Sequence, residues 1–164
     1  MMKRLQWAMC CIMLIAVATT AGAQVSGAGL KDLEKPYHPE ANAQADLDSL
    51  LIIAQKEHKR IVIQAGGNWC IWCLRFHNFI QEETAIAELV HDRLLYYHLN
   101  YSKENKNEAV FNRYAPEGAK LGYPFFIILD ESGEVLAVRE SGTLENGASY
   151  DKNKVLSFFR EYIQ

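Results

Sequence analysis

Residues 66–76 read GGNWCIWCLRF, so Cys70 and Cys73 are separated by two residues and each directly follows a tryptophan. The β-branched run at 61–63 that precedes them is typical of a strand buried on both faces. A helix is expected to begin at Cys70, with Phe76 on its apolar side. Two thiols therefore lie where a strand passes through a glycine-rich turn into a helix. That spacing is compatible with a structural disulfide, half of a zinc site or a redox-active pair.

The position of the pair favours redox chemistry over a structural role. Cys70 is expected at a helix start, where unpaired backbone N–H groups and the positive end of the helix dipole favour a thiolate. Cys73 lies three residues on, at a Cβ–Cβ separation of roughly 5–6 Å that local tightening can reduce to the distance a disulfide requires. A disulfide over so short a loop restrains the unfolded chain very little. Cys70 can instead attack a substrate disulfide, and Cys73 can then resolve the mixed disulfide.

The first 23 residues have the pattern of a secretory signal peptide: two basic residues, an apolar run over 7–18, and small residues ending at Ala23. Cleavage after Ala23 would remove Cys10 and Cys11 and leave a mature chain with one cysteine pair. We therefore expect an exported protein, periplasmic in the simplest case, with no membrane span in the mature chain. Secretion and anchoring by an uncleaved segment are the alternatives. Outside the cytosol a thiol pair is oxidised unless a partner reduces it.

The composition is that of a soluble globular protein, with 49% hydrophobic and 23% charged residues among 164 and a net charge of −3. An acidic balance without a stripe of Lys and Arg between aromatic residues indicates no nucleic-acid binding. A chain of this length buries roughly 68–70% of its unfolded surface, enough to hold a core without disulfides. We expect a linker or N-terminal arm over residues 24–40, followed by one domain over residues 41–164.

Hydrophobic spacing across that domain predicts helices that alternate with strands. The expected elements are a helix over 41–58, a strand at 61–63, a helix from 70, a short helix from 84 to near 90, a strand over 94–99, a helix over 105–114, a hairpin of 125–129 and 134–138, and a C-terminal helix around 155–163. Alternating strands and helices make parallel crossovers, and the late hairpin adds antiparallel neighbours. The order predicts an α/β three-layer sandwich with a central mixed sheet.

The buried strand is followed by Trp69-Cys70-Ile71-Trp72-Cys73, and the late hairpin is preceded by Gly122-Tyr123-Pro124. Together these motifs resemble the thioredoxin superfamily, in particular exported thioredoxin-like proteins with a WCxxC active site, over about residues 41–164. The resemblance implies a thioredoxin-like fold and a thiol-disulfide oxidoreductase in which Cys70 and Cys73 are catalytic. It implies a cis-proline at Pro124, with Tyr123 lining the substrate groove. Trp69 and Trp72, next to the cysteines, are further candidates for substrate contact, and packing around the pair is the alternative for both.

The resemblance also implies protein or peptide disulfides as substrates and an electron-donating redox partner, with no cofactor and no metal. Ile71 and Trp72 bring no charge to the sulfur of Cys70, so a strongly lowered pKa of that thiol is not expected. This favours the reduction or exchange of disulfides over their donation. A different class of function is a thioredoxin-like module that binds a peptide or a metal without redox turnover.

Two positions depart from the pattern of the superfamily. In thioredoxin an aspartate six residues before the first cysteine helps to move the proton of the second, whereas this chain has Gln64 there. A neutral amide cannot act as that base, which leaves water or Glu83 as alternatives. Gly66 and Gly67 stand where bulkier residues are common, and we interpret them as a turn that needs positive φ.

The histidines offer a metal site as a further hypothesis. His77 follows the second cysteine by four residues and could share a face with the pair. Two cysteines and one histidine are nevertheless one ligand short of a structural zinc site. The remaining histidines, which we expect on the surface or in strands, are His38, His58, His91 and His98.

Overall fold

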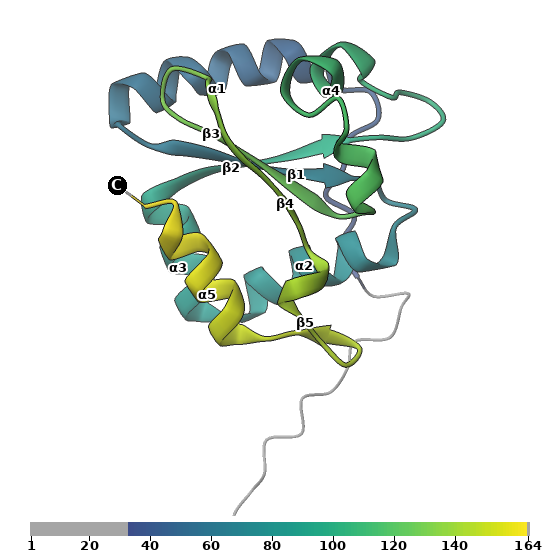
Figure 1. The fold of residues 1–164 in the computed structure, drawn as a ribbon, viewed down its shortest axis with the longest axis vertical. Helices are drawn as coiled ribbons and strands as arrows, with labels where there is room; N and C mark the ends of the chain where they lie inside the picture. The colour runs from purple at the N-terminus through teal and green to yellow at the C-terminus, as the bar shows by residue number, and fades with distance from the viewer. Residues whose placement is uncertain (1–32, 164) are drawn as a thin grey trace, which may run out of the picture.

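The computed structural model describes residues 33–163 (Figure 1). The expected signal peptide at 1–23 and the first part of the expected arm, 24–32, lie outside the described residues. Between residues 33 and 163, no helix is both long enough and apolar enough to cross a membrane.

The centre of the fold is a four-stranded sheet in the order β2-β1-β3-β4. Its strands are β1 (Arg60–Gly66), β2 (Leu94–Asn100), β3 (Phe125–Leu129) and β4 (Val135–Glu140). β1 is parallel to β2 and antiparallel to β3, which is in turn antiparallel to β4. The predicted mixed sheet, with a parallel crossover first and a hairpin last, is confirmed.

Helices cover both faces of this sheet (Figure 1). One face carries α1 (Ala43–Glu57) and α4 (Glu108–Tyr114), and the other carries α2 (Ile71–Glu82), α3 (Thr84–Arg93) and α5 (Lys152–Glu161). In β1, Val62 packs into the core on the side of α2, while Ile61 and Ile63 pack into the core on the side of α1. Successive strand residues point to opposite faces, so the apolar run at 61–63 serves both cores. The predicted three-layer α/β sandwich is confirmed.

The helix starts show how the sequence positions the cysteines. Asn42 caps α1 by accepting a hydrogen bond from the backbone N–H of Ala45 at 3.2 Å, and Asp151 caps α5 in the same way. Such side chains satisfy N–H groups that have no partner inside the helix. In α2 the capping residue is Cys70, whose sulfur accepts from the backbone N–H of Cys73 at 3.2 Å. The sulfur thus takes the place at which a helix start binds an acceptor.

The helix expected over 105–114 begins later, at Glu108, because the asparagines before it bind backbone groups of the loop. Asn105 Nδ2 donates to the carbonyl oxygens of Pro39 and Ala41 at 3.0 and 3.2 Å. Asn107 has a left-handed backbone with φ 48°, a conformation that asparagine tolerates better than most residues. Residues 102–107 therefore form a loop that holds the N-terminal arm.

A small second hairpin lies outside the predicted elements. It consists of β5 (Glu145–Asn146) and β6 (Ser149–Tyr150), joined through Gly147 with φ 59°. Strands of two residues carry no readable periodicity, although an Asn-Gly pair is a turn signal. Single turns of 3₁₀ helix, η1 (Gly118–Leu121) and η2 (Gly142–Leu144), were likewise not expected.

Candidate active site

The two cysteines form a disulfide at the start of α2, with Cα atoms 5.2 Å apart. Cys70 keeps 6% of its surface exposed and Cys73 none. The sulfur of Cys70 is therefore less open than a helix start alone suggested, because both cysteines pack in a small cluster with Tyr37, Trp72 and Tyr123. Only Cys70 retains a route to a second molecule.

The loop between η1 and β3 lies directly against Cys70. The Tyr123–Pro124 peptide bond is cis, and the carbonyl oxygen of Tyr123 lies 3.5 Å from Cys70 Sγ. A disulfide sulfur has no proton to donate, whereas the reduced thiol could donate one to this oxygen. Pro124 is buried and Tyr123 is partly exposed. Cys70 thus lies next to the backbone carbonyl of Tyr123, and the ring of the same residue is partly exposed to solvent.

An aromatic surface extends from this loop. Trp69 is 58% exposed, although its ring nitrogen donates to the carbonyl oxygen of Tyr101 at 2.6 Å. The rings of Trp69 and Tyr123 meet edge to face with centroids 5.5 Å apart, and Tyr123 stacks on Tyr101 at 5.6 Å. Beside them lies a hollow of about 390 Å³, lined by Trp69, Tyr101, Ser102, Lys103, Glu104 and Lys106. We call Trp69, Tyr101 and Tyr123 the aromatic surface.

Trp72 has a different environment, although it is also a neighbour of both cysteines. Its ring contacts the guanidinium of Arg75, 4.8 Å from the centroid, and the ring of Tyr150, whose centroid is 5.6 Å away. The hydroxyl of Tyr150 donates to the backbone oxygen of Trp72 at 3.1 Å. Tyr150 belongs to the unexpected hairpin, so sequence analysis missed this support. Trp72 is partly buried against the core, and only part of its ring is available to another molecule.

Beneath Cys73 the fold places a buried polar cluster around Gln64. The side chain of Gln64 is fully buried, and its Nε2 donates to the hydroxyl of Tyr37 at 2.7 Å and to the carbonyl of Cys73 at 3.0 Å. Its Oε1 accepts from the hydroxyl of Tyr96 at 2.7 Å. A carboxylate could donate neither of the first two bonds. Where thioredoxin has an acid that can act as a base, this chain therefore has an amide that hydrogen-bonds to Tyr37, Tyr96 and the carbonyl of Cys73.

The cluster carries no charge at neutral pH in its tyrosines or in His98. Burial, the largest cause in each case, raises the pKa of Tyr37 and of Tyr96 well above the ordinary value. Burial, with His77 nearby as a second cause, lowers the pKa of His98 to about 3. His98 lies in β2 and is partly buried, with its ring centroid 5.3 Å from that of Tyr37. Tyr37 and Tyr96 therefore act as neutral hydrogen-bonding partners of Gln64, and His98 is a neutral neighbour of Tyr37.

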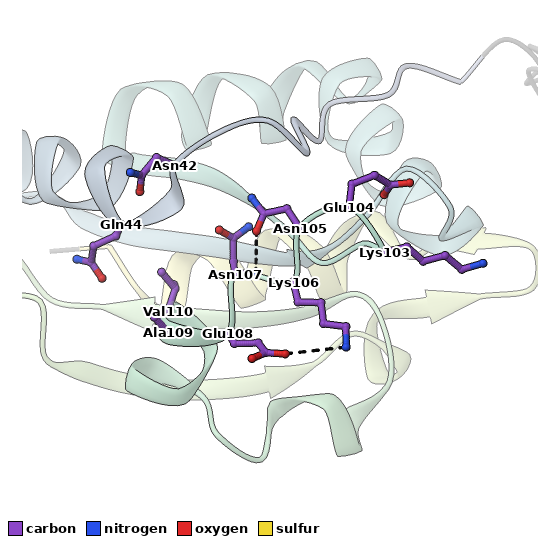
Figure 2. A pocket seen from close by; sticks show the side chains of 10 residues that line it. All are labelled: Asn42, Gln44, Lys103, Glu104, Asn105, Lys106, Asn107, Glu108, Ala109 and Val110. Carbon is purple, nitrogen blue, oxygen red and sulfur yellow. Dashed lines mark hydrogen bonds and ion pairs between the residues drawn. The ribbon is translucent and has the colours of Figure 1, made fainter.

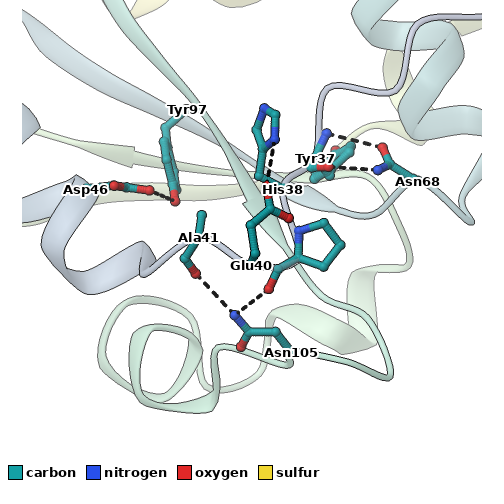
Figure 3. Close-up of polar contacts among 9 residues, drawn as sticks. Tyr37, His38, Glu40, Ala41, Asp46, Asn68, Tyr97 and Asn105 are labelled. Carbon is teal, nitrogen blue, oxygen red and sulfur yellow. Dashed lines mark hydrogen bonds and ion pairs between the residues drawn. The ribbon is translucent and has the colours of Figure 1, made fainter.

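Tyr37 reaches the cluster from the N-terminal arm, which packs along the domain (Figure 3). Asn68 binds both backbone groups of Tyr37: its Oδ1 accepts at 3.1 Å and its Nδ2 donates at 2.7 Å. Farther along the arm, Asn105 binds two carbonyls, as described above, and Glu34 contacts His77 at 3.2 Å. The segment from 34 to 41 is thus held at several points, and Tyr37 is only 2% exposed.

The glycines before the cysteines provide space rather than an unusual backbone. The prediction of positive φ at Gly66 and Gly67 was wrong, because the described glycines with positive φ are Gly122, Gly133 and Gly147. A Cβ on Gly66 would instead overlap Cys73 Sγ and lie 2.8 Å from the hydroxyl of Tyr37. A Cβ on Gly67 would lie 2.8 Å from the carbonyl of Tyr101. Close packing against the cysteine pair and the aromatic surface accounts for both residues.

A sequence model of a protein family described as a thioredoxin-like domain matches residues 47–152. The chain belongs to this family. Among solved structures, it is similar to a disulphide isomerase from Xylella fastidiosa Temecula1, with 19% identity, a TM-score of 0.69, and coverage of 79% of this chain and 97% of that chain. It is also similar to a structure described as a DsbH oxidoreductase, with 20% identity, a TM-score of 0.53, and coverage of 68% and 77%. At such identities the likeness concerns the fold. A search of curated proteins finds no match.

Two alternatives considered from the sequence can now be placed in the thioredoxin-like domain. Glu83 ends α2 at the opposite end from the cysteines and pairs with Lys152 at 2.6 Å. A helix of that length spans roughly 18 Å, so Glu83 cannot accept the proton of Cys73. His77 is buried against His98, with ring centroids 4.9 Å apart. Between residues 33 and 163, no group of three His, Cys, Asp or Glu side chains is arranged to hold a metal ion.

A further surface hollow lies at the start of α1 and the loop before α4 (Figure 2). It has a volume of about 460 Å³ and is lined mainly by polar residues of the 103–108 loop and by Asn42 and Gln44 at the start of α1. It shares Lys103, Glu104 and Lys106 with the hollow beside Trp69. It includes neither cysteine nor any of the substrate contacts expected from the sequence.

Proposed function

We propose that this protein is an exported thiol-disulfide oxidoreductase that uses Cys70 and Cys73 as its catalytic pair. The observation that carries the proposal is the Cys70–Cys73 disulfide at the start of α2, next to the carbonyl of Tyr123. A pair that can close a bond at this position can also be reopened by an incoming thiolate. Export rests on the signal-peptide pattern of residues 1–23, with the periplasm as the simplest destination.

The proposed reaction starts from the dithiol. The Cys70 thiolate attacks one sulfur of a protein or peptide disulfide, that bond breaks, and the second substrate sulfur leaves as a thiolate that takes up a proton. Cys73, after losing its proton, attacks Cys70 Sγ and releases the first substrate sulfur. The products are a substrate dithiol and the Cys70–Cys73 disulfide found in this structure. A partner that supplies two electrons must reopen the disulfide before another turnover.

Substrate binding is assigned to the side of the pair on which Cys70 lies. An extended segment next to the substrate disulfide would align with the backbone of Tyr123 and Pro124, and its side chains would contact Trp69 and Tyr123. Trp72 would contribute the part of its ring that is not covered by Arg75 and Tyr150. The reaction needs only sulfur chemistry, so the proposal includes neither a cofactor nor a metal.

Reduction or exchange is the favoured direction. A strong oxidant needs a Cys70 thiolate that is stabilised well beyond the ordinary, which charged or strongly donating neighbours provide. The residues between the cysteines are Ile71 and Trp72, and the guanidinium of Arg75 stacks on Trp72. The hydrogen bond from the backbone N–H of Cys73 is the main donation that Cys70 receives among the described contacts.

Reduction of insulin by dithiothreitol, followed by turbidity, tests this function. The full chain should accelerate the reaction, a Cys73→Ser variant should trap mixed disulfides through Cys70, and the chain with Cys10→Ser and Cys11→Ser should act like the parent. No acceleration by the parent would overturn the proposal. The low exposure of Cys70 favours one alternative, a thioredoxin-like module that binds a peptide without turnover. In that case Cys73→Ser would leave peptide binding intact and trap nothing.

A further inference from the structure

The hydroxyl of Tyr37 has one hydrogen-bonding capacity that the described contacts do not use. It accepts from Gln64 Nε2 at 2.7 Å, so its own hydrogen remains to be donated. Tyr96 differs, because its hydroxyl already donates to Gln64 Oε1. Buried hydroxyls normally find an acceptor. The free hydrogen of Tyr37 therefore points to an acceptor that appears in another state of the protein.

The second sulfur is the group that gains accepting power when the disulfide opens. Tyr37 packs in one cluster with Cys70 and Cys73. The hydroxyl of Tyr37 and Cys73 Sγ both lie under 3.0 Å from the point where a Cβ on Gly66 would stand. In the oxidised protein no hydrogen bond is described between the Tyr37 hydroxyl and Cys73 Sγ, because a disulfide sulfur is a weak acceptor. A thiolate is a much stronger acceptor, and an opened Cys73 is free to turn toward the hydroxyl.

We propose that the hydroxyl of Tyr37, delivered by the N-terminal arm, donates a hydrogen bond to the sulfur of Cys73 and stabilises the thiolate that resolves the mixed disulfide. This inference rests on the proposed function and assigns to the arm a part in it. Asn68 holds the backbone of Tyr37 in place, Gly66 leaves the space between hydroxyl and sulfur, and Gln64 fixes the other side of the hydroxyl. The neutral hydroxyl of Tyr37 thus acts on the sulfur of Cys73, in a chain that has Gln64 at the position of the thioredoxin aspartate.

The step needs no added reagent. In the mixed disulfide, Cys73 loses its proton, its thiolate attacks Cys70 Sγ, and the bond between Cys70 and the substrate breaks. The electron pair leaves with the substrate sulfur, which takes up one proton and so balances the one that Cys73 lost. Tyr37 keeps its own proton throughout, because burial raises its pKa well above the ordinary value. Its contribution is to lower the free energy of the attacking thiolate.

The other titratable groups around the pair do not supply this donation. Tyr96 donates to Gln64, and burial raises the pKa of Tyr123, whose carbonyl rather than hydroxyl faces Cys70. Burial lowers the pKa of His98 to about 3, which keeps it neutral. His77 contacts Glu34 at 3.2 Å, on the part of α2 one turn beyond Cys73. Neither residue of this pair is substituted in the variants whose Cys73 is titrated below.

The experiment measures the pKa of Cys73 in a state that resembles the mixed disulfide. In the full chain with Cys10→Ser and Cys11→Ser, Cys70→Ser leaves one thiol and keeps an oxygen that can cap α2. Titration of ¹³Cβ-labelled cysteine by NMR then reports Cys73 alone. Adding Tyr37→Phe should raise the pKa of Cys73 by about one pH unit, a tenfold change in its acid constant. Adding Tyr96→Phe, which also removes a buried hydroxyl, should leave it within a few tenths of a unit.

A kinetic readout uses the intact pair. Reduced protein releases two equivalents of thionitrobenzoate from Ellman's reagent, the first on attack by Cys70 and the second on resolution by Cys73. In Tyr37→Phe the second phase should slow about threefold at pH 7, because a roughly tenfold smaller thiolate fraction is partly offset by a more nucleophilic thiolate, while the first phase stays unchanged. Asn68→Ala, which releases the arm, should act in the same direction and serves if Tyr37→Phe does not fold.

The outcomes separate this inference from the function beneath it. An unshifted Cys73 in Tyr37→Phe, or an equal shift in Tyr96→Phe, overturns the role of Tyr37 even if the parent reduces insulin. A parent that fails to reduce insulin overturns the proposed function, whatever the titration gives. A shift confined to Tyr37→Phe together with a slower second phase supports the inference.

Discussion

The two cysteines lie one helical turn apart and have opposite surroundings. Cys70 faces the Tyr123 carbonyl and the exposed rings of the aromatic surface. Cys73 faces a sealed polar cluster in which Gln64 bonds to Tyr37 and Tyr96. One turn of α2 therefore separates a sulfur that can meet a second molecule from one that can meet only its partner sulfur. The same pair of residue types acquires two chemical roles from its neighbours.

The two sides are also built from different parts of the chain. The side of Cys70 consists of loops, with residues 67–69, the Tyr101 region and the turn before β3. The side of Cys73 consists of the middle of β1 and β2, sealed by the arm. Changes on the sealed side should therefore alter stability and the second step of the reaction. Changes on the loop side should alter substrate recognition.

The largest effect is expected for Gln64→Leu, which removes the centre of the sealed side. The hydroxyls of Tyr37 and Tyr96 and the carbonyl of Cys73 each lose a partner, at about 1–3 kcal/mol for each buried group left unsatisfied. We expect the free energy of unfolding to fall by about 2–5 kcal/mol in urea denaturation. Gln55→Leu, on the exposed face of α1, is the matched control and should change it by less than about 0.5 kcal/mol. Equal effects would show that the cluster adds no stability.

A somewhat smaller effect is expected for Gly66→Ala on the same side. The added Cβ meets Cys73 Sγ and the hydroxyl of Tyr37, and overpacking of this kind costs about 1–3 kcal/mol. Gly142→Ala places a methyl group where nothing lies within 4 Å and is the control. Thermal unfolding of the oxidised proteins compares the two. If both variants melt together, the close approach at Gly66 does not restrict the residue type.

Acid should weaken the sealed side through His98. Its pKa falls from 6.5 to about 3 on folding because it is buried, so between these values the unfolded chain binds more protons than the folded one. Stability therefore rises with pH in this window and is lost as the pH falls from 6.5 toward 3, by up to about 1.4 kcal/mol per pH unit. His98→Phe should flatten the pH dependence of the urea midpoint, whereas His91→Phe, at an exposed position, should not. An unchanged slope in His98→Phe would contradict the prediction.

Sequence patterns were sufficient for the sheet, the helices on both faces and the cysteine pair. The signals that predicted them are local: the apolar run at 61–63, the hairpin residues around Gly133 and the WCxxC motif. Each lies within a short window of sequence and can be recognised without a structure. The resemblance to thioredoxin, rather than a local signal, identified Gln64 as a departure at the position of the aspartate. What neither could provide was its set of partners, because Tyr37 and Tyr96 come from segments 27 and 32 residues away.

The misses follow the same physical rule. Gly66 was interpreted through backbone conformation, whereas its role depends on a sulfur seven residues on and a hydroxyl from the arm. Tyr150 was not expected at Trp72, since the hairpin that carries it is too short to show a pattern. Asn105 was expected at the start of a helix, whereas its side chain donates a hydrogen bond to the carbonyl of Pro39 in the arm. Contacts between distant segments decide each of these cases, and no single window of sequence contains them.

The smallest effect on stability, and the one specific to the loop side, is expected for Trp69→Ala. The exposed ring gives up one hydrogen bond to Tyr101, so the free energy of unfolding should fall by about 1 kcal/mol or less. If the aromatic surface binds substrate, KM for a disulfide peptide should rise about two- to tenfold with kcat nearly unchanged. Trp72→Ala provides the contrast. Because it loses packing against Tyr150 and Arg75, it should lower the free energy of unfolding more than Trp69→Ala does and raise KM less. Should Trp69→Ala instead slow the second thionitrobenzoate phase and leave KM alone, the division of roles between the two sides of the pair would be wrong.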